Sequence, residues 1–175
     1  MADASDTGGG GVRFGAHWLV FFGLAATVLV LDQLTKAILV ANLDPAEAVQ
    51  VIGDYVRFVF SQNSGALFGL FKDQAPLFAL VSIGVVALIV FYHGQSGRNL
   101  YLSIALGLLL GGALGNMADR LRLGYVVDFV DIGIGGFRWY TFNVADAAIS
   151  VALVMLVALA FIPSLSRTVE GQAGG

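Results

Sequence analysis

Two aspartates, Asp128 and Asp146, stand close to long apolar segments of the chain. A charged side chain at membrane depth is costly to keep there, so it indicates function by default. Two carboxyl groups held close together share one proton, because full ionisation would place two negative charges side by side. The ionised member can take a proton from water while the protonated member donates to a carbonyl oxygen. Such a pair can hydrolyse a peptide bond without a nucleophilic side chain or a metal ion.

Each aspartate also has a structural interpretation. Asn143 can cap a helix that begins beside it, and Asp146 three residues later resembles the second half of a capping box. A carboxylate in the first turn also favours the helix dipole. Asp128 can be a solvated loop carboxylate. The residue pattern leaves these interpretations open beside the catalytic one.

More polar residues gather on the same side of the predicted spans. Asp32 and Lys36 have the i, i+4 spacing of a helical ion pair. Asn116 and Arg120 have the same spacing at the end of a later apolar segment, with Asp119 between them. We therefore expect one polar cluster at one end of a helical bundle.

The composition narrows the chemistry further. The chain has 175 residues, of which 58% are hydrophobic and 12% charged, and its mean hydropathy is +0.85. A net charge of −3 gives no reason to expect a nucleic-acid partner. The absence of cysteine excludes disulfides, thiolate metal sites and a cysteine nucleophile. His17 and His93 flank separate apolar segments, and we interpret them as anchoring or solvated residues. We expect no metal site and no cofactor.

The apolar segments predict four membrane-spanning helices, since a helix needs about 20 apolar residues to cross the hydrocarbon core. The spans are expected at residues 16–43, 75–92, 100–118 and 144–162. The first must continue through Asp32 and Lys36, because Trp18–Leu31 alone would give only roughly 21 Å of helix. A cleaved signal peptide is the alternative for this segment, but Asp3 and Asp6 precede it and no small-residue cleavage site follows.

The segments between the spans predict a small sheet. Val51–Phe60 is rich in β-branched and aromatic residues and is expected to be one strand, with a turn at residues 61–69. Gly135 and Gly136 lie between two short β-like segments, which predicts a hairpin within residues 132–142. The fold class is therefore a membrane all-α protein: four transmembrane helices with a small surface sheet and a hairpin loop.

The whole chain, residues 1–175, is expected to be one integral membrane domain. Its glycine-containing tails, 1–15 and 164–175, are predicted to be flexible. On the third span, small residues at i, i+4 spacing predict close helix packing: Gly107, Gly111 and Gly115.

Four spans place both termini on the same side of the membrane. Basic residues usually mark the cytoplasmic side. Three lie on the side of the termini and six on the other side, so the count alone places the termini outside. The first group is Arg13, Arg98 and Arg167; the second is Lys36, Arg57, Lys72, Arg120, Arg122 and Arg138.

Five motifs occur in a specific order along residues 32–150. They are "DQLTK" (Asp32–Lys36), "QNSGALFG" (Gln62–Gly69), "GGALGNMADR" (Gly111–Arg120), "VVDFVDI" (Val126–Ile132) and "FNVADAAIS" (Phe142–Ser150). Together they closely resemble the bacterial lipoprotein signal peptidases, or type II signal peptidases. Any one motif alone would be weak, but five in order are highly specific.

The resemblance implies an aspartyl protease of the bacterial inner membrane. It would cut the signal peptide from prolipoproteins just before the lipid-modified cysteine. The family's catalytic pair falls on Asp128 and Asp146. Substrate-binding positions fall on Asn63, Asn116, Arg120 and Asn143, and supporting polar positions on Asp32, Lys36 and Asp119.

The resemblance also implies a membrane orientation opposite to the charge count. Both termini would be cytoplasmic, with the polar cluster and a substrate-cradling sheet at the periplasmic face. The expected partners are lipid-modified prolipoproteins and membrane lipids, and we expect the protein to act as a monomer.

Two other functions fit parts of the sequence. One is a proton- or ion-coupled transporter with Asp32, Asp128 and Asp146 as relay residues, although four spans without an inverted repeat or a broken helix argue against it. The other is a membrane assembly factor without catalytic activity, whose polar cluster docks a partner. Peptide cleavage by the purified protein would separate both from the protease.

Overall fold

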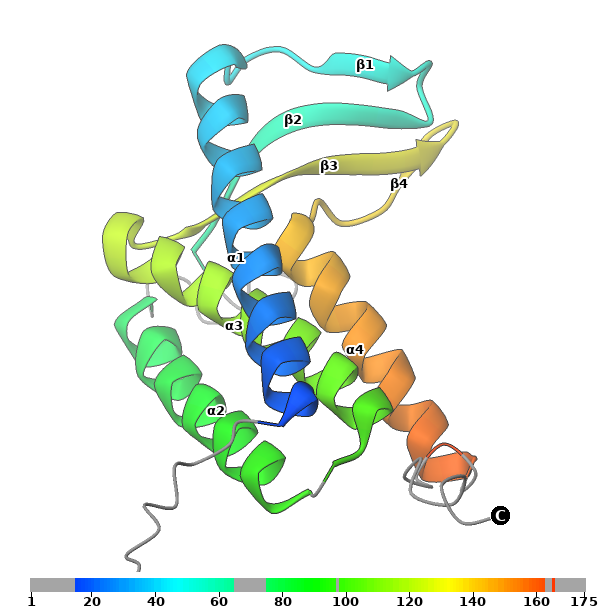
Figure 1. Cartoon of the computed structure of the whole chain (residues 1–175). Coiled ribbons are helices and arrows are strands. Elements are labelled where there is room, and N and C mark those ends of the chain that lie inside the picture. The colour runs from blue at the N-terminus through cyan, green and yellow to red at the C-terminus, as the bar shows by residue number, and fades with distance from the viewer. Residues whose placement is uncertain (1–14, 65–74, 97, 163–164, 166–175) are drawn as a thin grey trace, which may run out of the picture.

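The computed structural model describes residues 15–64, 75–96, 98–162 and 165. Its helices are α1 (Ala16–Asn42), α2 (Ala75–Gln95), α3 (Leu100–Leu123) and α4 (Val144–Phe161). All four are long and apolar enough to cross a membrane. A four-stranded antiparallel sheet lies at one end of the bundle (Figure 1). The predicted fold class is therefore confirmed.

Helix α3 forms the centre of the bundle. Half of its most apolar stretch is buried, against less than a quarter in each of the other helices. Glycines bring neighbouring backbones against it: a methyl group at Gly111 would lie 2.7 Å from the backbone oxygen of Ala25, and one at Gly112 would lie 2.6 Å from that of Ala145. The predicted close packing is confirmed at Gly107 and Gly111, which lie against the backbone of α1, whereas the contact with the backbone of α4 is made at Gly112, outside the predicted ridge.

The outward faces of the helices are apolar. Leu19 is 70% exposed, Val154 70% and Phe161 82%, whereas Phe21 and Leu106 belong to the buried core. Large apolar side chains exposed along whole helices are suited to lipid rather than water.

The sheet has the strand order β1 (Val49–Ile52), β2 (Val56–Asn63), β3 (Val126–Ile134), β4 (Phe137–Arg138). The prediction of one strand at residues 51–60 was wrong, because the chain reverses between β1 and β2. Gly53 adopts a φ of +48°, and the Tyr55 N–H donates to the carbonyl of Ile52. Ser61–Asn63, predicted as part of a turn, continue β2. Ser64 follows the strand, and residues 65–69 of the predicted turn lie outside the described residues.

The predicted glycine hairpin is confirmed between β3 and β4, where Gly135 has a φ of +58°. Strand β3 also pairs with β2, and Asp128 lies within this paired segment, opposite Ser61. The Asp128 residue is only 1% exposed. The interpretation of Asp128 as a solvated loop carboxylate is therefore wrong.

The interpretation of the histidines as solvated residues is wrong for His93. This residue is 2% exposed, stacks on Phe21 with ring centroids 4.0 Å apart, and shares a hydrogen bond with the Ser103 hydroxyl. The two histidine rings, distant in sequence, lie 5.6 Å apart. Packing of α1, α2 and α3 against each other buries His93 at their meeting point.

The start of α1 and the end of α4 lie at the end of the bundle opposite the sheet (Figure 1). This agrees with four spans that return the chain to its starting side. The prediction of flexible tails concerns residues that, apart from Gly15 and Leu165, lie outside the described part of the chain.

Candidate active site

Asn143 caps α4 and joins Asp146 in a capping box. The Asp146 N–H donates to Asn143 Oδ1 at 2.9 Å, and the Asn143 N–H donates to Asp146 Oδ2 at 3.2 Å. The predicted cap is therefore present. It uses one oxygen of Asp146, and the second oxygen accepts a different hydrogen bond.

Asp128 approaches this helix start from β3. Its Oδ1 accepts a hydrogen bond from Asn143 Nδ2 at 2.7 Å, and its Oδ2 accepts one from Asn63 Nδ2 at 3.1 Å. Asn63 is the last residue of β2, so the β2–β3 pairing places it beside Asp128. Asn143 therefore contacts both aspartates.

Asn116 on α3 completes the link between the two aspartates. Its Nδ2 donates to Asp146 Oδ1 at 2.8 Å, and its Oδ1 accepts from Asn143 Nδ2 at 3.2 Å and Lys36 Nζ at 3.3 Å. The two carboxyl groups are thus joined through the amides of Asn116 and Asn143, which fix their orientations.

A buried ionic cluster of Lys36, Asp32 and Asp119 lies next to this pair. Lys36 Nζ is 2.8 Å from Asp32 Oδ2 and 2.8 Å from Asp119 Oδ2, and all three residues are at most 4% exposed. The predicted i, i+4 ion pair is confirmed. Two carboxylates against one ammonium leave a net negative charge, so the other hydrogen bonds of these carboxylates are needed to stabilise them.

Those hydrogen bonds hold the backbone next to each member of the pair. Asp32 Oδ1 accepts from the N–H of Ala145, which precedes Asp146. Asp119 Oδ2 accepts from the N–H of Val127, which precedes Asp128. The ionic cluster therefore positions both aspartates, one through α4 and one through β3.

Arg120 lies one turn beyond Asn116 on α3. Its Nη1 donates to the Asn116 carbonyl at 3.2 Å, and its guanidinium lies 5.6 Å from the centre of the Phe78 ring on α2. All nine site residues predicted from the sequence thus belong to one connected region at the sheet end of the bundle.

Sequence reasoning missed Gln33 and Tyr140. Gln33 Nε2 donates to Asp119 Oδ1 at 2.9 Å, and its Oε1 accepts from Arg122 Nη1 at 3.0 Å. Gln33 directly follows Asp32 in the "DQLTK" motif, and this position could have indicated that it belongs to the polar cluster. Burial and then the negative charges of Asp128 and Asp146 raise the pKa of Tyr140, so this phenol lies near the pair; no motif indicated it.

The electrostatics of Asp128 suit acid–base chemistry. Burial raises its pKa, and the negative charge of Asp146 raises it further. Hydrogen bonds from Asn63 and Asn143 and the charge of Lys36 oppose this, and the pKa is about 7. A carboxyl group that exchanges its proton near neutral pH can act as an acid or a base.

Within residues 15–64, 75–96, 98–162 and 165, no group of three or more His, Asp or Glu side chains is arranged to hold a metal ion.

Comparison with known proteins identifies the family. A family described as "Signal peptidase (SPase) II" matches residues 24–162. The lipoprotein signal peptidase of Pseudomonas fluorescens Pf-5 is 43% identical over 151 residues, which cover 82% of this chain and 87% of the relative. That of Moorella thermoacetica is 41% identical over 138 residues, with 78% and 89% covered. That of Psychromonas ingrahamii is 34% identical over 167 residues, with 93% and 94% covered.

Two solved structures share the fold. Both are described as bacterial membrane enzymes determined by the in meso method. The one at 2.3 Å resolution has a TM-score of 0.77 and 27% identity, with 85% of this chain and 92% of the other covered. The one at 1.9 Å resolution has a TM-score of 0.73 and 29% identity, with 81% and 92% covered. The chain therefore belongs to the signal peptidase II family, the lipoprotein signal peptidases, and is a membrane peptidase with four apolar helices and a surface sheet.

Proposed function

We propose that the protein removes signal peptides from diacylglyceryl-modified prolipoproteins, cutting just before the lipid-modified cysteine, with Asp128 and Asp146 as the catalytic pair. The observation that carries this proposal is the amide link between them: Asn143 donates to Asp128 and caps with Asp146, while Asn116 donates to Asp146. Helix capping accounts for one oxygen of Asp146 but not for the bonds of Asn116 to Asp146 and of Asn143 to Asp128.

The pair shares one proton, so its pKa values belong to both residues together. The ionised carboxylate takes a proton from a water molecule as the water oxygen bonds to the scissile carbonyl carbon. The protonated carboxyl donates to the carbonyl oxygen. When the tetrahedral intermediate collapses, the C–N bond breaks and the leaving amine takes a proton from the pair, which returns to its starting state.

The supporting residues fall into two groups: those that hold the two carboxyl groups in place, and those that we propose to contact the substrate. Asn143 is fully buried and Asn116 nearly so, and both amides bond within the site. We therefore propose that they orient the two carboxyl groups and do not contact the substrate directly. Among the described residues, Arg120 donates a side-chain hydrogen bond to the Asn116 carbonyl, and the five N–H groups of a guanidinium suit the backbone carbonyls of a peptide. Arg120 and Asn63, at the end of β2, are the proposed substrate contacts.

The membrane placement follows from the substrate. A lipid-anchored precursor presents its scissile bond at the membrane surface, where water can reach it. Asp146 lies in the first turn of α4, at the sheet end of the bundle. We propose that this end faces the periplasm in the bacterial inner membrane, that both termini are cytoplasmic, and that the protein acts as a monomer.

The catalytic assignment is tested with the purified full-length protein in detergent and a synthetic diacylglyceryl-modified prolipoprotein. Asp128→Asn and Asp146→Asn should each lower turnover by about a thousandfold or more. Asp44→Asn is the matched control, because Asp44 is an exposed carboxylate outside the site. Near-normal turnover in either dyad variant would show that the mechanism is wrong, and absence of cleavage by the unmodified protein would favour a transporter or an assembly factor.

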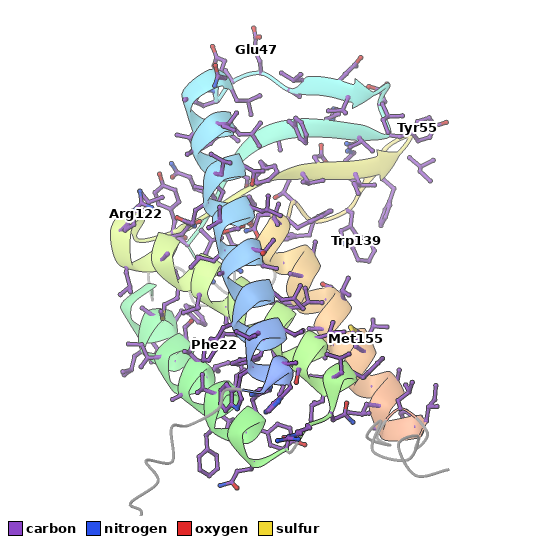
Figure 2. The ribbon with its side chains drawn as sticks, viewed as in Figure 1. Phe22, Glu47, Tyr55, Arg122, Trp139 and Met155 are labelled. Atoms are coloured by element: carbon purple, nitrogen blue, oxygen red, sulfur yellow. The ribbon has the colours of Figure 1, made fainter. Side chains whose placement is uncertain are left out.

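The orientation is tested by cysteine labelling, since the chain has no native cysteine. Glu47→Cys lies in the exposed loop before β1, at the far end of the sheet (Figure 2). Arg98→Cys lies in the turn between α2 and α3, at the opposite end. A membrane-impermeant thiol reagent added to spheroplasts should label position 47 and spare position 98. The reverse pattern would place the site in the cytoplasm and remove its access to lipoprotein precursors.

A further inference from the structure

The β3–β4 hairpin has two chemically different faces. Ile134 pairs with Phe137, and Gly133 pairs with Arg138. Paired residues in an antiparallel ladder share a face, and successive residues along a strand alternate between faces. Ile134 and Phe137 therefore lie on one face together with Ile132. Arg138 lies on the other face together with Gly133 and Asp131.

The face with Arg138 is polar and internally paired. Asp131 accepts hydrogen bonds from Arg57 Nη2 at 2.6 Å and from Arg138 Nε at 3.0 Å. Burial would raise the pKa of Asp131, but the hydrogen bonds and charges of Arg138 and Arg57 outweigh it and hold the pKa below its usual value. This ion triad joins β2, β3 and β4, so the hairpin is held firmly to the sheet.

The face with Ile134 is apolar and open. Ile132 is 40% exposed, Ile134 73% and Phe137 69%. Trp139 follows two residues after Phe137, its N–H donates to the carbonyl of Ile132 at 2.7 Å, and it is 65% exposed. These four residues, Ile132, Ile134, Phe137 and Trp139, form what we call the apolar hairpin face. Exposed apolar patches of this kind mark interaction surfaces.

The position of this face relative to α4 indicates what covers it. Trp139 precedes the α4 cap, Asn143, by four residues, and it lies at the level of the first turns of α4 (Figure 2). The 18 residues of α4 give roughly 27 Å of helix, close to the thickness of a hydrocarbon core of about 30 Å. The start of α4, and Trp139 with it, therefore lies at the membrane–water boundary, where tryptophan is enriched.

We propose that the apolar hairpin face is embedded in the lipid leaflet on the sheet side of the membrane, with bilayer lipid itself as the partner. In this placement the ion triad on the opposite face remains in water. Asp128 lies at the buried end of the same strand, six residues before Ile134. Contact of the hairpin with the leaflet would therefore hold Asp128 near the membrane surface.

The test uses nitroxide labels on single cysteines in the full chain, reconstituted into nanodiscs of phosphatidylethanolamine and phosphatidylglycerol. Ile134→Cys reports on the apolar hairpin face. Gln50→Cys is the matched control, because Gln50 is exposed on β1 and pairs with Arg57, on the polar face. The label at position 134 should collide more often with oxygen, which dissolves in lipid, and the label at position 50 with a water-soluble nickel chelate.

Either of two outcomes would overturn the proposal. A label at position 134 that prefers the nickel chelate as strongly as position 50 would show that the face is in water. A label shielded from both collision partners would show that protein covers the face, and dipolar broadening between labels would then identify a second copy. Phe137→Cys serves as a replacement on the same face where the Ile134 variant does not fold.

Tryptophan fluorescence gives a second measurement. The chain has two tryptophans, so Trp18→Phe leaves Trp139 alone. Lipids with bromine near the carbonyl end of the acyl chain should quench Trp139 at least about twofold more than lipids with bromine near the chain end, as expected for an interfacial residue. Adding Trp139→Phe and Gln50→Trp moves the only tryptophan to the polar face, which lipid bromine should not quench. Lack of lipid quenching of Trp139 would contradict the proposal.

Discussion

Replacing Asp128 by asparagine should change the stability of the protein with opposite signs at low and high pH. The pKa of Asp128 is raised from about 3.8 to about 7 in the folded protein. A raised pKa means that the folded state binds the proton more tightly than the unfolded state. Stability is therefore highest below the unfolded pKa and is lost as the pH rises through the folded pKa. A shift of three pKa units corresponds to about 4 kcal/mol lost above pH 7.

Asparagine removes this charge penalty but fits the site less well. The two oxygens of Asp128 accept hydrogen bonds from two amide nitrogens, one of Asn143 and one of Asn63. An asparagine at position 128 offers one oxygen and one NH2 group, so one of those donors loses its acceptor at a cost of about 1–3 kcal/mol. The variant should be less stable than the unmodified protein by about that amount at pH 4. At pH 8 it should be more stable by about 1–3 kcal/mol.

The measurement is the free energy of unfolding of both proteins in mixed micelles with increasing denaturing detergent, followed by circular dichroism at pH 4 and pH 8. Asp44→Asn provides the baseline for a carboxylate exposed to water. The reasoning is refuted if the variant is less stable than the unmodified protein at pH 8 by as much as at pH 4, or by more. Loss of cleavage with a gain of stability at pH 8 would show that this carboxyl group is kept for function at the expense of the fold.

The remaining predictions concern the rate, the helix packing and the ionic cluster. Cleavage should decline as the pH rises above about 7, because Asp128 loses the shared proton there; a flat profile to pH 9 would contradict this. Gly111→Ala should lower the free energy of unfolding by about 1–3 kcal/mol, because the methyl group would lie 2.7 Å from the Ala25 oxygen, whereas Gly84→Ala, with open space around it, should be neutral or stabilising. Lys36→Met should cost about 3–5 kcal/mol in unfolding assays and lower activity, because two buried carboxylates lose their cation. Activity should persist in chelators such as EDTA, and recovery with added zinc after its loss would indicate a metal-dependent mechanism.

The helices were predictable because a membrane span is recognised by its length and its hydropathy. The positions of the helix ends were less predictable. Helix α3 continues past the predicted residue 118 to Leu123, carrying Arg120 and Arg122 beyond the apolar stretch. A charged turn can remain helical where polar partners are close. The helix ends at Gly124, whose φ of +79° allows the reversal into β3.

The presence of a sheet was predictable, but the pairing of its strands was not. Alternation of apolar residues indicated strand at residues 51–60, but it did not show that the chain reverses at Gly53. The pairing of β2 with β3 depends on packing between segments far apart in sequence, and no local pattern records it. Asp128 was therefore assigned to a loop in the structural interpretation, although it lies within β3.

The site residues were predictable as a set, whereas their individual partners were not. The motifs placed Asp32 and Asp119 in one cluster with Lys36. Only the folded structure shows that Asp32 bonds to the Ala145 N–H and Asp119 to the Val127 N–H. The first contact joins α1 to α4 beside Gly115, and the second depends on the turn that leads from α3 into β3.

The bond between Asp32 and Ala145 has a consequence for how the enzyme is made. It joins the first helix to the last across 113 residues. During synthesis α1 enters the membrane long before α4 exists, and Asp146 arrives with α4 itself. A chain that stops before residue 146 lacks Asp146. In a chain whose last helix is misplaced, Asp146 does not lie beside Asp128. With the proposed pair as the catalytic groups, a truncated or incompletely inserted copy would be an inert membrane protein rather than an uncontrolled protease, and proteolytic activity would begin only when the whole molecule has been assembled.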